Sequence, residues 1–97
     1  MPEIAMPTQL KSPYHILYVD DEEKALHYFR ELFGDDYIVH IATNAMDGYR
    51  ILQEYGTQIG LLLTDQRMPG PSGVELMEHA RKLNPNLIRI LVTAYTD

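Results

Sequence analysis

The fold of this chain is decided by the stretch Ile59-Gly60-Leu61-Leu62-Leu63-Thr64, which runs directly into Asp65. A run this short and apolar predicts a strand covered on both faces, as the central strands of a parallel sheet are. The next segment, residues 66–72, contains two prolines and a glycine and is expected to be a loop. We therefore expect Asp65 to lie at the carboxyl end of a central parallel strand.

Strand-like and helix-like patterns alternate on both sides of that stretch. Strands are expected at residues 15–19, 37–41 and 87–93, and helices at residues 22–33, 45–55 and 73–83, the second capped by Thr43 or Asn44. The apolar helix faces are expected to include Leu32 in the first helix and Leu83 in the third. This alternation predicts an α/β fold, a doubly wound parallel sheet with helices on both faces.

Composition restricts the possible functions. The chain has 97 residues, of which 45% are hydrophobic, so it allows one domain with a modest core. It has no cysteine, which excludes disulfides and thiolate metal sites and fits a cytoplasmic protein. The net charge is −6 and the 8 Lys and Arg residues are scattered, which argues against direct nucleic-acid binding. No apolar run is long enough for a membrane span. Residues 1–13 are expected to be a flexible leader, and residues 14–97 the domain.

Acidic residues follow two of the expected strands. Asp20 and Asp21 come just after the first strand and Asp65 after the third, while Thr93 ends the fourth. If the first and third strands are neighbours, all four side chains meet at one edge of the sheet. Two like charges ~4 Å apart repel by about 4 kcal/mol at an effective dielectric of 20, so the carboxylates need a counter-charge. Mg²⁺ prefers such oxygen ligands, and carboxylates are known to form aspartyl-phosphate intermediates.

Three motifs resemble the receiver domain of bacterial two-component response regulators. They are Tyr18-Val19-Asp20-Asp21-Glu22, then Leu63-Thr64-Asp65-Gln66-Arg67-Met68-Pro69-Gly70 with Ser72-Gly73, and Leu91-Val92-Thr93-Ala94. The resemblance covers residues 15–97 and implies the flavodoxin-like receiver fold. It also implies that Asp65 is the phosphoacceptor, that Asp21 binds Mg²⁺ directly and that Asp20 acts through a coordinated water. Arg67 matches the position whose backbone carbonyl completes the metal site, and Thr93 matches the switch hydroxyl.

Receivers of this family continue beyond the position matched by Asp97, with a further helix, a fifth strand that ends in a lysine, and a fifth helix. No lysine follows Lys82 in this chain, so the last β-α unit is lacking here. We expect a longer parent protein that carries these elements and an output domain. In the present chain an exposed sheet edge is expected, with possible self-association through it.

The function that the resemblance implies is a phosphorelay switch. A partner histidine kinase or phosphotransfer protein phosphorylates Asp65 with Mg²⁺, and Thr93 transmits the change; beyond limited self-phosphorylation and self-dephosphorylation, no enzyme activity is expected. The alternative is a pseudo-receiver that binds proteins without phosphorylation. A haloacid-dehalogenase-like hydrolase is disfavoured because Glu22 stands where a second Asp is needed, and a nucleotide binder because no Gly-rich phosphate loop occurs. The four histidines are expected to be structural or surface residues. The tyrosines are expected to be packing residues with their hydroxyls in water.

Overall fold

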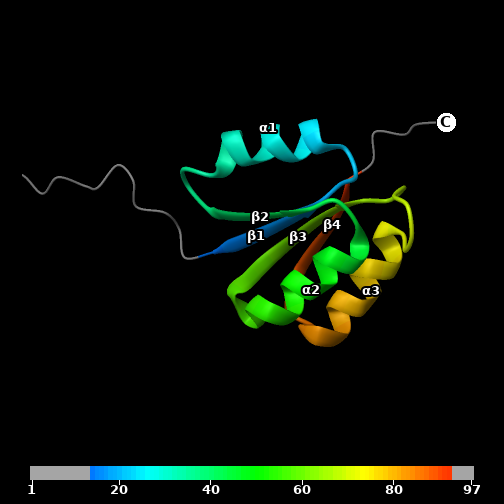
Figure 1. Ribbon diagram of the computed structural model, residues 1–97. Helices are drawn as coiled ribbons and strands as arrows, with labels where there is room; N and C mark the ends of the chain where they lie inside the picture. Colours follow the sequence, from blue (N-terminus) through cyan, green and yellow to red (C-terminus); the bar gives the residue numbers. More distant parts are fainter. Residues whose placement is uncertain (1–13, 93–97) are drawn as a thin grey trace, which may run out of the picture.

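The computed structural model describes residues 14–92, which form one parallel sheet between two layers of helices. The elements are β1 (His15–Val19), α1 (Glu23–Phe33), β2 (Ile38–Ala42), α2 (Ala45–Tyr55), a 3₁₀ turn (Gly56–Gln58), β3 (Ile59–Asp65), α3 (Gly73–Leu83) and β4 (Ile88–Val92). The strand order is β2-β1-β3-β4, and α1 covers one face while α2 and α3 cover the other (Figure 1). The predicted α/β class and doubly wound parallel sheet are confirmed.

The core lies between the sheet and the α2–α3 layer. Leu17, Val19 and Leu62 of the central strands are fully buried against Leu52 and Leu76 of the two helices. Gly48 lets α2 approach β1 closely, because a Cβ atom there would lie 2.8 Å from a methyl group of Val19. Central β1 and β3 are thereby held between helices, which fixes the strand ends where the acidic residues lie.

Two strands start one residue later than the sequence predicts. The second strand begins at Ile38 because the Tyr37 N–H closes the preceding turn on the Phe33 carbonyl at 2.9 Å. The fourth begins at Ile88 because the Leu87 N–H is likewise engaged by the Asn84 carbonyl at 3.1 Å. In each case the backbone N–H of the first residue in the apolar run donates its hydrogen bond within the turn and not to the neighbouring strand.

The predicted ends of α2 are confirmed, whereas the predicted start of α1 and the predicted apolar faces of α1 and α3 are partly wrong. Asn44 caps α2, accepting a hydrogen bond from the Asp47 N–H at 2.8 Å, and Gly56 ends the helix with a positive φ of 57°. In contrast, α1 begins at Glu23, with Glu22 as an extended N-cap residue. The apolar faces are also narrower than predicted, because Leu32 is 71% exposed and Leu83 43% exposed. Within residues 14–92, the helices are all too short or too polar to cross a membrane.

Candidate functional site

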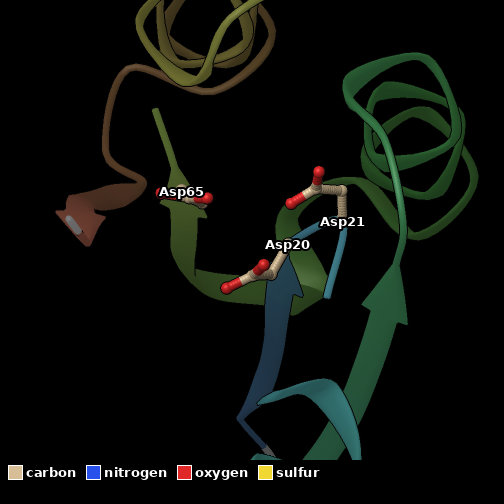
Figure 2. A group of neighbouring side chains, drawn as sticks. All are labelled: Asp20, Asp21 and Asp65. Carbon is tan, nitrogen blue, oxygen red and sulfur yellow. The ribbon is translucent and has the colours of Figure 1, made fainter. Parts of the chain in front are cut away.

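Three carboxylates meet at the carboxyl edge of the sheet. Asp20 and Asp21 follow β1 directly, and Asp65 is the last residue of β3 (Figure 2). β1 and β3 are paired neighbours in which Val19 lies opposite Thr64, so Asp20 and Asp65 come next on adjacent strands. One oxygen from each of the three carboxylates lies within 4.8 Å of the other two. The predicted convergence of these acids is therefore confirmed.

Asp20 is the buried member of the cluster, and both of its carboxylate oxygens accept hydrogen bonds from the chain. The Tyr18 hydroxyl donates to Oδ2 at 2.7 Å, and the Glu22 N–H donates to Oδ1 at 2.9 Å. Burial raises the pKa of Tyr18 well above its ordinary value, and the hydrogen bond to Asp20 and the nearby carboxylates raise it further. The phenol therefore stays protonated and remains a donor.

Tyr18 corrects the expectation that the tyrosine hydroxyls lie in water. Its ring packs 4.8 Å from that of Phe29, between the sheet and α1, and only 8% of the residue is exposed. Residues two apart on a strand face the same way, so Tyr18 and Asp20 share a side of the sheet. That spacing in Tyr18-Val19-Asp20 is the sequence signal that could have identified this contact.

Asp21 and Asp65 are more open than Asp20. Asp21 is exposed, and no residue in the described range donates a hydrogen bond to it. Asp65 is partly buried and accepts the Gln66 N–H through Oδ1 at 2.9 Å. Its other oxygen, Oδ2, accepts no hydrogen bond from residues 14–92. The cluster thus contains one fixed carboxylate and two with free lone pairs.

The start of α3 fixes the backbone around Asp65. The Gly73 N–H donates to the Gln66 carbonyl at 3.1 Å, and the Gln66 side chain accepts the Val74 N–H at 2.9 Å. A Cβ atom on Gly73 would clash with the Asp65 carbonyl oxygen, so only glycine lets the helix approach this closely. Ser72 and Glu75 complete a capping box at the same end. The loop after β3 is therefore tied at both of its ends.

The donor set fits a hard divalent cation. All three ligand candidates are carboxylate oxygens, which Mg²⁺ prefers over nitrogen or sulfur. Two oxygens bound at 2.0–2.1 Å lie at most about 4.2 Å apart across the ion. The 4.8 Å limit on the present separations is close to that span, so a small adjustment or an intervening water suffices.

Two further residues, Thr93 and Arg67, were predicted to belong to the site. Thr93 lies outside the described residues, although Val92, which precedes it, is paired with Asp65 in the β3–β4 ladder. Arg67 lies in the loop after β3, and the metal-binding role of its carbonyl stays a prediction.

Comparisons with known proteins identify the family of this chain. Residues 16–97 match the family model described as the response regulator receiver domain. The hydrogenase transcriptional regulatory protein HoxA of Bradyrhizobium diazoefficiens is 34% identical over 84% of this chain, and the sensor kinase CckA of Brucella abortus 27% identical over 98%. A response regulator receiver domain protein from Clostridium thermocellum superposes with a TM-score of 0.78 at 31% identity, covering 82% of this chain. The chain spans 16% of HoxA, 10% of CckA and 64% of that solved chain.

Proposed function

This chain belongs to the response regulator receiver domain family of two-component signalling, and we propose that Asp65 accepts its phosphoryl group. A receiver is a signalling module and not a classical enzyme. The observation that carries the proposal is the difference in hydrogen bonding among the three carboxylates. Asp20 has both oxygens engaged by the chain, whereas Asp65 keeps one oxygen without a hydrogen bond from residues 14–92. That free oxygen is suited to act as a nucleophile.

We assign the metal-binding roles by the same criterion. Asp21 and Asp65 have lone pairs free for direct contact with Mg²⁺, while Asp20, held by Tyr18 and Glu22, is suited to receive a coordinated water. The Arg67 carbonyl completes the proposed ligand set. Bound Mg²⁺ supplies neutralisation of the carboxylates and of the phosphoryl oxygens.

The proposed reaction is transfer from a phosphohistidine of a partner kinase or phosphotransfer protein. An Asp65 oxygen attacks phosphorus, the O–P bond forms, and the P–N bond breaks. The imidazole nitrogen leaves with the bonding electron pair and takes up a proton from solvent. The products are an acyl phosphate on Asp65 and an unmodified histidine. The Gly73 contact and the Gln66 hydrogen bonds orient Asp65 for this attack.

The proposed output is a shift between two pre-existing conformations. The new charge on Asp65 attracts the Thr93 hydroxyl, and the state in which the two are in contact becomes more populated. The relatives named above include a transcriptional regulator and a sensor kinase, and each is much longer than this chain. We therefore propose an output domain outside these residues. We propose that residues 14–97 themselves are cytoplasmic and bind neither nucleic acid nor membrane.

The test is intact-mass measurement of the chain after incubation with acetyl phosphate and Mg²⁺. We expect a single phosphoryl adduct that hydroxylamine removes, as it does an acyl phosphate. The adduct should disappear when Mg²⁺ is omitted and in Asp65→Asn. Asp36→Asn, an exposed aspartate in the turn after α1, is the matched control and should label normally.

Labelling of Asp65→Asn equal to that of the parent chain would refute Asp65 as the acceptor. Failure of the parent chain to label, combined with Mg²⁺-dependent shifts of the Asp20 and Asp21 resonances, would refute phosphotransfer in this chain and favour the pseudo-receiver alternative.

A further inference from the structure

Two histidines are in contact at the end of the sheet opposite the carboxylates. His15 begins β1 and His40 lies in β2, and Nδ1 of His15 is 2.9 Å from Nε2 of His40. The two rings are stacked with centroids 5.1 Å apart, and the Tyr55 ring of α2 packs 4.3 Å from that of His40. Asp20 is five positions after His15, a separation of roughly 16 Å along an extended strand. The pair is therefore separate from the phosphorylation site.

The distance between the two nitrogens can be compared with the distance between two ligands of one metal ion. Metal–imidazole bonds are about 2.0–2.1 Å long. Two nitrogens at right angles around such an ion lie about 2.9 Å apart, whereas tetrahedral ligands lie about 3.3 Å apart. Square-planar or tetragonal nitrogen and oxygen sites are typical of Cu²⁺ and Ni²⁺. The hydrogen bond between the two rings holds the nitrogens 2.9 Å apart, a separation that two adjacent corners of such a site also have.

We propose that His15 and His40 form a two-imidazole site for a tetragonal first-row divalent ion, Cu²⁺ or Ni²⁺, with water completing the coordination. The pairing of β1 with β2 holds the two backbones in register, with His40 opposite Leu17, so both side chains extend from the same face of the sheet. In the metal-free chain the two nitrogens share a hydrogen bond, which the ion replaces.

The surroundings of His40 favour its neutral, metal-binding form. Burial lowers the pKa of His40 below its ordinary value, the charges of His15 and Arg30 lower it further, and only Glu54 acts in the opposite direction. Both histidines are partly exposed, so an ion can reach them. The carboxylate of Glu54 also compensates part of the charge that the ion brings. Imidazoles select such ions over Mg²⁺, which is suited to the carboxylate cluster.

The experiment is a calorimetric titration of the chain with Cu²⁺ in excess Mg²⁺, which competes for the carboxylates. We expect one tight equivalent, with nitrogen hyperfine structure in the electron paramagnetic resonance spectrum. His15→Asn and His40→Asn should each weaken binding at least about tenfold, since even outer partners of metal ligands contribute 10–100-fold. His27→Asn, on an exposed position of α1, is the matched control and should bind like the parent chain.

A second measurement does not depend on folded variants. Substoichiometric Cu²⁺ should broaden the imidazole proton resonances of His15 and His40 in the parent chain before those of His27 and His79. Any of three results would overturn the site. They are equal broadening of all four histidine resonances, equal Cu²⁺ affinity of the three Asn variants, and no tight Cu²⁺ binding by the parent chain.

Discussion

The hydroxyl of Tyr18 and the carboxylate of Asp20 lie in contact in a part of the molecule that excludes most water, with 8% of each residue exposed. A buried acceptor that loses its donor costs more free energy than an average hydrogen bond contributes. Tyr18 therefore has a structural role for the cluster beyond the packing of its ring. It fixes the one carboxylate that has no freedom to reorient.

Tyr18→Phe should destabilise the chain by about 1–3 kcal/mol, because it leaves Asp20 Oδ2 without its protein donor. The measurement is urea unfolding followed by circular dichroism. Tyr28→Phe removes a hydroxyl from a residue that is 67% exposed and should leave the free energy of unfolding unchanged. Equal stability of the two variants would contradict a structural role for the Tyr18 hydroxyl.

Because the pKa of His40 is lowered in the folded chain, we expect the free energy of unfolding to depend on pH in metal-free buffer. Burial lowers its folded-state pKa, with His15 and Arg30 acting in the same direction and Glu54 against it. The unfolded chain therefore binds a proton more readily than the folded one. This contribution to stability is fully present above the ordinary value of 6.5 and is lost as the pH falls through 6.5 toward the lower folded-state pKa. Urea midpoints measured across that range should fall on acidification, and less steeply in His40→Gln than in the matched His27→Gln.

At the residue scale, the sequence predicted the acids better than their neighbours. Asp20, Asp21 and Asp65 follow strands, and the ends of neighbouring parallel strands meet whatever the details of packing. The contact between His15 and His40 depends on the register of β1 against β2, which the apolar pattern does not specify to one residue. The Tyr18 hydroxyl depends on which side of the sheet α1 covers, and that is also a tertiary property.

At the scale of elements, the start of α3 connects helix stability to the position of Asp65. Gly73→Ala places a methyl group against the Asp65 carbonyl oxygen and 3.0 Å from a methyl group of Leu91. Overpacking of this kind typically costs about 1–3 kcal/mol. Because the strained contact is with the backbone of Asp65, we expect acetyl phosphate labelling of this variant to slow as well. Unchanged labelling in a destabilised variant would show that Asp65 tolerates the shift.

Ser72→Ala is the companion substitution at the same helix end. It removes the hydroxyl that accepts the Glu75 N–H at 3.2 Å, and loss of such a cap costs about 1 kcal/mol. Ser72 has no hydrogen bond to Asp65, so labelling of the folded protein should keep its rate. Slower labelling, measured at a temperature where both variants are folded, would mean that the cap also positions Asp65.

The boundaries of α3 and β2 show where element prediction succeeds. α3 was predicted at residues 73–83 and is observed there, because a capping box begins it and Asn84 ends it. β2 was displaced by one residue, because the sequence does not show that the Tyr37 N–H is used by a turn. The side-chain signals at the ends of α3 predicted its bounds, whereas the backbone hydrogen bond that shifts the start of β2 has no such signal in the sequence.

At the scale of the whole molecule, the two helix layers leave the sheet unequally covered. Among residues 14–92, α2 and α3 pack on one face, whereas α1 alone lies on the other (Figure 1). A largely apolar groove of about 410 Å³ remains beside α1, lined by residues that include Phe29, Leu63 and Ile88. In β4, which is an edge strand among the described residues, Ile88 is 62% and Ile90 45% exposed. Such a combination favours association of one sheet edge with another.

We therefore expect this chain to self-associate through β4 and the groove beside α1. Sedimentation equilibrium should give an average mass that rises with protein concentration. Ile88→Lys should lower that mass toward the monomer, since a charge on an edge strand opposes pairing with a second edge. Leu32→Lys introduces the same charge at a position of α1 that is 71% exposed and should leave association unchanged. Equal reduction by both variants would show that the effect is not specific to β4. A concentration-independent monomer mass for the parent chain would refute self-association through this edge.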